Sequence, residues 1–432
     1  MTGLAPYLLA IVAVAALLGG IALIRTAGTR LGWSGEVQRK GVHVMVGLFA
    51  MTLPALFPGR WPVVLLVLLA LGVMLAMRLS GGLLGRAGAA IHSVERRSFG
   101  DIWLAVAIGF LFLRSEGHYI LYGLPLAIIT LSDAAAALTG SAYGRRRFPT
   151  EDGVKSWEGV TAFIMVGWVA AMAMLLLFSD APRGNVIVLG LVITGFGAMV
   201  EAVSWRGLDN LFVPLAVHFF LRGFLDADPL ALCAVAVLFF AGAVLAQAAA
   251  GWLKLAPSTA RAFAVALFIF LGVGGIYGAV IPALAMATYL LTRRALPGGG
   301  RHPDLDFLGT LCAAAAIWLF IGEMTGPTSI HFYNLAMAGI VVGYALPALA
   351  RCWWAALLVP LAWLAVMLFT ASHIGLALPP RSFQWTAALT LGLTALVVCL
   401  RPGWFTRWRT PRVAALASAV PLIAYFHAVG VL

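Results

Sequence analysis

The chain has 432 residues, of which 62% are hydrophobic and only 10% are charged, and its mean hydropathy is +1.01. Such values exclude a water-soluble domain, and the long unbroken apolar runs exclude a β-barrel, whose strands alternate apolar and polar residues. A net charge of +12 in a chain of this kind is the usual signature of basic cytoplasmic loops, so we expect no nucleic acid as a partner.

Apolar segments recur along the whole chain. A membrane-spanning helix needs about 20 apolar residues, so the sequence predicts an all-α fold, a polytopic bundle of roughly 14 to 16 membrane helices. In the first half the expected spans are 4–24, 41–57, 61–78, 99–115, 118–139, 158–178, 185–203 and 208–225.

The distribution of basic residues predicts the orientation of these spans. Arg25 and Arg30 follow the first span, the reverse of a signal peptide's charge order, so this span is expected to be retained. If the N-terminus is outside, most lysines and arginines up to residue 225 lie on the cytoplasmic face. Those on that face are Arg25, Arg30, Arg39, Lys40, Arg78, Arg86, Arg96, Arg97, Arg145, Arg146, Arg147, Lys155 and Arg206, against Arg60, Arg114, Arg183 and Arg222 on the other. We therefore expect an integral protein of a bacterial or archaeal inner (plasma) membrane.

Four polar segments, 35–47, 92–101, 131–159 and 201–210, fall at the predicted cytoplasmic face. They contain nine of the sixteen acidic residues, namely Glu36, Glu95, Asp101, Asp133, Glu151, Asp152, Glu158, Glu201 and Asp209. A nucleotide site with a metal ion needs both charges, because carboxylates hold Mg²⁺ while Arg and Lys bind the phosphate oxygens. A surface that only binds anions would not need the acids.

Single residues of these segments also have structural explanations. Asp133 could end a helix, although acidic residues at span ends are costly and usually functional. Gly140 and Gly144 could pack helices or let a phosphate approach the backbone. Ser156 could cap the next helix, and Glu158 could favour its positive end.

The segment Arg39–His43 places two cations and an imidazole on one helical face. His43 follows Lys40 by three residues and Arg39 by four, which is the spacing of neighbours on a helix. A lone interfacial histidine is more often a satisfied polar residue than a base, so the prediction depends on the whole group.

Five motifs in order resemble the phytol kinase and dolichol kinase family. They are Arg-Lys-x-x-His from Arg39, Glu-Arg-Arg-Ser-Phe-Gly from Glu95, Ser-Asp-Ala-x-Ala-x-x-x-Gly-x-x-x-Gly-Arg from Ser132, Lys-Ser-x-Glu-Gly from Lys155 and Asp-Asn-Leu-x-Val-Pro from Asp209. The central block is also similar to that of phosphatidate cytidylyltransferases. The resemblance covers about half of the chain, from Glu36 to Arg222.

The resemblance implies a cytosolic nucleotide site and a kinase that transfers the terminal phosphoryl group of CTP to a polyisoprenoid alcohol such as phytol, geranylgeraniol or dolichol. It implies nucleotide-binding residues Arg39, Lys40, Glu95, Arg96, Gly140, Gly144, Arg145, Ser156, Glu158, Gly159 and Asn210; catalytic residues Asp133, Lys155 and His43; and Mg²⁺ ligands Asp133, Asp209 and Glu158. Val154 and Val160 depart from the family pattern, in which a lysine and a serine are common. The kinase class is therefore more firmly indicated than the choice of CTP over another nucleoside triphosphate.

Two other functions remain open. A phosphatidate cytidylyltransferase would use the same groups to transfer CMP to a lipid phosphate, with release of pyrophosphate. A membrane transporter would place its ionisable groups near the bilayer midplane, at broken helices. The clustering of these groups at one interface favours the lipid-modifying enzyme.

Residues 1–225 are thus expected to form a kinase-like membrane domain, and residues 226–432 a further multi-span domain. The second half could shape the lipid cavity, form a homodimer contact or have its own function. Its segment 255–294 contains a central glycine cluster, which favours two short helices in a hairpin. Glu323 and His331 are interpreted as polar residues of an outer loop.

Overall fold

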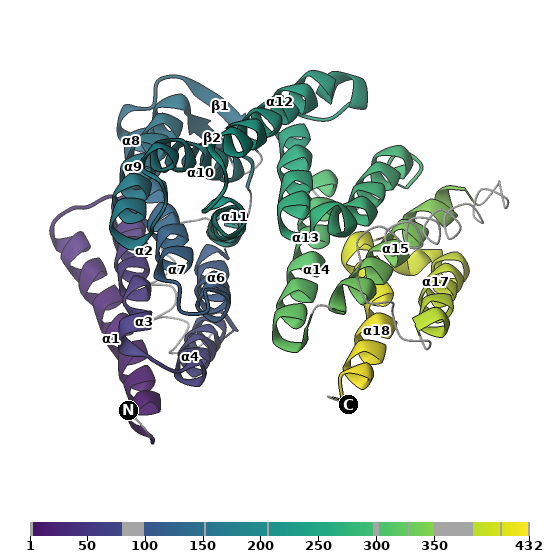
Figure 1. The fold of residues 1–432 in the computed structure, drawn as a ribbon, viewed down its shortest axis with the longest axis horizontal. Coiled ribbons are helices and arrows are strands. Elements are labelled where there is room, and N and C mark those ends of the chain that lie inside the picture. Colours follow the sequence, from purple (N-terminus) through teal and green to yellow (C-terminus); the bar gives the residue numbers. More distant parts are fainter. Residues whose placement is uncertain are drawn as a thin grey trace. The chain divides into compact units, whose positions relative to one another are not determined.

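The computed structural model describes residues 3–79, 99–150, 153–204, 207–296, 302–326, 328–349, 383–406 and 408–430. The chain divides into two compact units, Met1–Ala241 and Gly242–Leu432, and one helix, α12 (Pro229–Leu253), crosses the boundary. Figure 1 shows the helices of both units.

The first unit is almost entirely helical, as the sequence predicts. Its helices are α1 (Ala5–Arg30), α2 (Gly35–Met51), α3 (Leu53–Leu56), α4 (Arg60–Leu79), α6 (Gly100–Arg114), α7 (Tyr119–Ala127), α8 (Asp133–Tyr143), α9 (Trp157–Phe178), α10 (Arg183–Val203) and α11 (Asp209–Phe224). A π-helical turn, η1 (Ile128–Ser132), joins α7 to α8, and two short antiparallel strands, β1 (Arg147–Thr150) and β2 (Gly153–Ser156), join α8 to α9.

The second unit contains the rest of α12 and α13 (Pro257–Thr292), α14 (Pro303–Thr325), α15 (Ser329–Ala348), α17 (Phe383–Leu400) and α18 (Arg409–Ala428), with a 3₁₀ turn, η2 (Pro402–Phe405). Across the described parts of both units, ten helical segments are long and apolar enough to cross a membrane. The prediction of an all-α polytopic membrane protein is therefore confirmed.

The segment α7–η1–α8 is the buried centre of the first unit. It packs against α2, α9 and α11, and its side chains are largely buried. Pro125 lies inside α7 and has no N–H to offer the carbonyl four residues earlier. That carbonyl, of Leu121, instead accepts a hydrogen bond from Nδ1 of His218 on α11, at 2.8 Å.

Two serine caps begin the helices that carry the predicted site. The Ser34 hydroxyl accepts a hydrogen bond from the Val37 N–H at the start of α2. The Ser156 hydroxyl accepts one from the Gly159 N–H at the start of α9, at 3.1 Å. Such caps satisfy N–H groups that have no partner within the helix, so the capping role considered for Ser156 is present.

In the second unit, α13 folds back on itself at Gly275. This glycine has φ 60° and ψ −163°, a conformation that is essentially restricted to glycine. The Arg293 guanidinium donates hydrogen bonds to the carbonyls of Leu253 and Lys254, at 2.7 and 2.8 Å. The two ends of the segment are therefore close together, and the hairpin expected from the glycine cluster is confirmed.

The interpretation of Glu323 and His331 as loop residues is wrong. Glu323 lies in α14 and His331 lies in α15, because only residues 326–328 separate these two helices. The His331 side chain is buried, and its Nδ1 is 2.8 Å from the Tyr277 hydroxyl. Buried polar groups of this kind are satisfied by partners on neighbouring helices.

Candidate functional site

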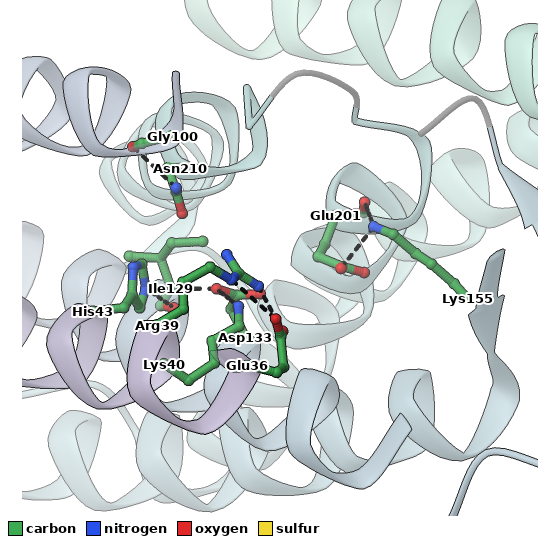
Figure 2. A network of polar contacts seen from close by, with 10 residues as sticks. All are labelled: Glu36, Arg39, Lys40, His43, Gly100, Ile129, Asp133, Lys155, Glu201 and Asn210. Atoms are coloured by element: carbon green, nitrogen blue, oxygen red, sulfur yellow. Dashed lines mark hydrogen bonds and ion pairs between the residues drawn. The ribbon is translucent and has the colours of Figure 1, made fainter. Parts of the chain in front are cut away.

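The centre of the site is a buried carboxylate, that of Asp133, the first residue of α8. Its partners come from α2. The Lys40 ammonium donates a hydrogen bond to its Oδ2 at 2.5 Å, and both side chains are less than one-tenth exposed. His43, one helical turn further along α2, places its Nε2 3.5 Å from the same oxygen. Figure 2 shows the three side chains meeting where α2 crosses α8.

The hydrogen-bond partners of His43 indicate its tautomer. Its Nε2 is 3.1 Å from the Ile129 carbonyl and faces Asp133, and both of these neighbours are acceptors. The hydrogen of a neutral imidazole is therefore on Nε2, which leaves a lone pair on Nδ1. Ile129 belongs to the π-turn η1, and turns of this type are frequent at functional sites.

A close contact between glycine and threonine holds α2 against this turn. A Cβ atom added to Gly47 would lie 2.0 Å from Oγ1 of Thr130, so only glycine allows α2 to approach η1 this closely. Because Lys40 and His43 are on the same helix, this contact also determines their distance from Asp133.

Lys155 forms the second ion pair of the site, which is partly buried. Strand β2 alternates, with Val154 exposed and Lys155 turned inward. The Lys155 ammonium donates to Oε1 of Glu201 at 2.7 Å and also to the Glu201 backbone carbonyl near the end of α10. Figure 2 shows this lysine reaching from the strand to Glu201.

Electrostatics link the two ion pairs. Burial alone would lower the pKa of Lys155, but the nearby carboxylates of Glu201, Asp209 and Asp133 outweigh it and raise this pKa above its usual value. The attraction to Asp133 and Asp209 shows that residues of α8, α11 and β2 lie within electrostatic range of one another.

Arg39 and Glu36 form a more exposed pair beside Lys40. The Arg39 guanidinium donates two hydrogen bonds to the Glu36 carboxylate, at 2.6 and 3.1 Å, and about half of the arginine side chain is exposed. Asp133 and Asp209 also attract Arg39, so this cation borders the same cluster.

Asn210 connects the start of α11 to α6. Its amide nitrogen donates to the Gly100 carbonyl at 3.0 Å, and its amide oxygen is buried without a partner among the described residues. Asn210 therefore fixes the position of its neighbour Asp209.

The glycine-rich part of the central block packs helices. A Cβ on Gly159 would lie 2.8 Å from the Ala136 carbonyl, and one on Gly144 would lie 2.9 Å from Cβ of Ser156. These glycines bring the end of α8 against the start of α9, which is the packing explanation considered for them. Their contact with a nucleotide stays a prediction.

Glu158 orders the basic loop before β1. Its carboxylate accepts the backbone N–H of Arg146, at 3.0 and 3.3 Å, while Arg145 is exposed on the same turn. A metal-binding role for Glu158 stays a prediction, and the Glu95 and Arg96 predictions lie outside the described residues.

The structure therefore brings together Arg39, Lys40, His43, Asp133, Lys155 and Asp209. The site residues predicted from the sequence do not include Glu201 and Glu36, which pair with Lys155 and Arg39. A signal for Glu201 was present, because a carboxylate within an apolar span needs a partner.

A comparison with curated proteins finds a phytol kinase from Synechocystis that is 30% identical to this chain over 222 residues. The match covers 49% of this chain and 89% of the relative. No family model and no solved structure matches the chain. This similarity shows that the chain belongs to the phytol kinase and dolichol kinase family.

Proposed function

We propose that this protein is an integral-membrane kinase that transfers the terminal phosphoryl group of CTP to a polyisoprenoid alcohol at the cytoplasmic face. The similarity to a phytol kinase supports the reaction class. The observation that carries the proposal is the buried Lys40–Asp133–His43 cluster, with Lys155 within electrostatic range of it. An acid, a base and two cations are the groups that phosphoryl transfer requires.

The cations of the site are proposed to bind the phosphates of the nucleotide. Lys40 is buried and Lys155 is partly buried, each beside a carboxylate, and Arg39 and Arg145 lie at the exposed edge. Positive groups that are already positioned stabilise the charge that develops on the transferred phosphoryl group, and they do so most strongly where water is excluded.

The donor set fits Mg²⁺. Asp133 and Asp209 supply the hard oxygen atoms that this ion prefers, and no group of three or more His, Cys, Asp or Glu in the described residues could enclose a metal. Mg²⁺ usually binds through one or two carboxylates together with phosphates and water. We propose that Asp133 and Asp209 hold it, where it would neutralise phosphate charge.

His43 is proposed to act as the base. In the transfer, a bond forms between the alcohol oxygen and the terminal phosphorus atom, and the bond from that phosphorus to the nucleoside diphosphate breaks. The alcohol proton passes to Nδ1 of His43, whose Nε2–H is held by the Ile129 carbonyl. A neutral imidazole with its lone pair on Nδ1 can accept this proton.

The lipid alcohol is proposed to approach laterally between the membrane helices. His43 is near the middle of α2 and is about one-tenth exposed. An isoprenoid alcohol can therefore keep its chain among the lipid tails and bring only its hydroxyl group to His43. The predicted cytoplasmic orientation puts the nucleotide on the side where nucleotides are abundant.

The test is a phosphorylation assay with purified protein in detergent and Mg²⁺. CTP, ATP or UTP labelled at the terminal phosphate is offered with phytol, geranylgeraniol, a longer polyprenol or diacylglycerol. We expect labelled lipid phosphate from CTP and an isoprenoid alcohol, and we expect Asp133→Asn to reduce the rate by about 100-fold or more.

Asp101→Asn is the matched control. Asp101 is also ion-paired, with Arg78 at 2.5 Å, but it is not part of the proposed site. The Asp101→Asn variant should therefore keep the wild-type rate of phosphoryl transfer. Release of pyrophosphate instead of a nucleoside diphosphate would identify cytidylyl transfer. Absence of labelled lipid with every pair of substrates would refute the kinase proposal.

A further inference from the structure

Lys40 lies where a metal ion on Asp133 would lie. Its ammonium group is 2.5 Å from Oδ2, and His43 Nε2 is 3.5 Å from the same oxygen. The Lys40 side chain is only 4% exposed, so in this arrangement the buried carboxylate is already neutralised by a monovalent cation from the protein itself.

A divalent cation cannot join Lys40 on this carboxylate without strong repulsion, because burial strengthens the interaction between charges. Lys40 must then leave Asp133, but a buried ammonium group that loses its anionic partner is costly. The phosphates of a nucleotide would supply a replacement anion. The flexible lysine side chain can move between two such partners while its backbone stays on α2.

We propose that Lys40 excludes a free divalent cation from Asp133 and yields this carboxylate only when a nucleotide brings phosphates to receive the ammonium group. The site would then take metal and nucleotide together and would not bind the metal alone. This inference rests on the proposed function, since it assigns phosphate as the second partner of Lys40.

Lys155 provides a less buried example of the same arrangement in this site. It is partly buried and also paired with a carboxylate, that of Glu201, and the Asp209 carboxylate attracts it as well. Both lysines are thus neutralised by acids before any phosphate arrives. In each case a phosphate could replace the acid as partner without leaving the lysine unpaired.

The test measures the binding of Mn²⁺, a probe for oxygen-ligand Mg²⁺ sites, from the electron paramagnetic resonance signal of the free ion. Wild-type protein in detergent without nucleotide is expected to bind Mn²⁺ weakly. Lys40→Gln keeps a hydrogen-bond donor near Oδ2 but removes the charge, and it should bind Mn²⁺ alone about tenfold more tightly. The same variant should bind metal-free CTP more weakly in equilibrium dialysis.

Arg39→Gln is the matched control. It removes one positive charge from the neighbouring position of α2, but its guanidinium is hydrogen-bonded to Glu36 and not to Asp133. Its affinity for Mn²⁺ alone should stay within about twofold of wild type. Equal gains in both variants would indicate a general effect of charge and would overturn the proposal, as would no gain in Lys40→Gln.

A folding defect in Lys40→Gln would not hide the result. Lys40→Met preserves the apolar stem of the side chain and gives a second measurement, and Mn²⁺ should raise the thermal midpoint of either variant but not that of wild type. These readouts need no lipid substrate. If the Lys40 variants bind Mn²⁺ more tightly but the wild-type protein phosphorylates no lipid, only the proposed reaction is refuted. If the wild-type protein is an active kinase but the Lys40 variants bind Mn²⁺ no more tightly, only the metal exclusion is refuted.

Discussion

Lys155 and Glu201 show how a partly buried lysine is kept charged. Burial favours the neutral amine, and the Glu201 carboxylate reverses this preference, so that the pKa of Lys155 is raised. A group with a raised pKa contributes stability that is fully present below its unfolded pKa and is lost as the pH rises through the folded value. Lys155 is therefore charged throughout the neutral range.

We predict that Glu201→Gln makes the proposed kinase activity sensitive to alkaline pH. Without this carboxylate, burial is opposed only in part, by Asp209 and Asp133, so the pKa of Lys155 falls and the amine loses its proton at a lower pH than in wild type. The alkaline limb of the profile of kcat/KM against pH should move to lower pH. This profile, measured between about pH 6 and 10, identifies Glu201 as a positioning residue that acts through Lys155.

Glu36→Gln provides the comparison for that experiment. It removes a carboxylate whose partner, Arg39, stays protonated at every accessible pH, so the alkaline limb should not move. If Glu201→Gln lowers activity equally at all pH values, the carboxylate has only a structural role.

At this scale the sequence identifies types of residue more reliably than pairs of residues. Asp133, Lys155 and His43 follow from motifs, but the partners Lys40 for Asp133 and Glu201 for Lys155 are distant in the chain. Such pairings depend on how α2, α8 and α10 pack, which hydrophobic periodicity does not specify.

At the level of secondary structure, the helices follow the predicted spans closely, because long apolar runs in lipid can satisfy their backbone groups only as helices. The π-turn η1 and the strands β1 and β2 were not predicted. Nothing in the apolar pattern distinguishes the π-turn from the helices on either side of it. The two strands have only four residues each, which is too short for the alternation of apolar and polar residues that predicts a strand.

Two of the prolines inside helices have side-chain partners for the carbonyls that they release. His218 donates to the Leu121 carbonyl, four residues before Pro125. In the second unit the Tyr333 hydroxyl donates to the Gly278 carbonyl, four residues before Pro282. In both cases a neighbouring helix supplies the hydrogen bond that proline cannot make.

We predict that Gly47→Ala impairs the site although it is a full turn away from His43. The added methyl group would overlap the Thr130 side chain, so α2 must move away from η1, and Lys40 must move away from Asp133. Overpacking of this kind costs about 1–3 kcal/mol. Both the unfolding free energy and the rate of phosphoryl transfer should fall.

Gly41→Ala tests the specificity of that effect on the same helix. A Cβ at Gly41 would lie 3.5 Å from Ile24, an ordinary contact, and alanine is the better helix former by about 0.5–1 kcal/mol. Stability should be equal to or above that of wild type. Equal losses in the two variants would show that α2 tolerates no added side chain, and the explanation based on the Thr130 contact would be wrong.

For the whole molecule, all described residues of the site belong to the unit Met1–Ala241. The phytol kinase relative is matched over 89% of its length by about half of this chain. Buried polar contacts in the second unit, such as those of His331 and Arg293, link its own helices. We therefore expect the catalytic apparatus to be complete in the first unit.

The corresponding prediction is that a chain ending at residue 256, after α12, retains phosphoryl transfer. Ending there keeps α12 whole, although this helix crosses the boundary between the units. The purified truncated protein should show a kcat within about threefold of the full chain, a change of less than 1 kcal/mol in the activation free energy. Its KM for nucleotide should be unchanged, because Lys40, Asp133 and Lys155 are all present.

The KM for the lipid alcohol distinguishes the roles open to the second unit. An unchanged value would separate that unit from the reaction and favour an independent function. A raised KM for long polyprenols but not for short ones would show that the second unit extends the lipid cavity, because only the far end of a long chain would lose its contacts. Loss of all activity in a truncated protein that remains monodisperse and folded would contradict the assignment of the whole site to the first unit.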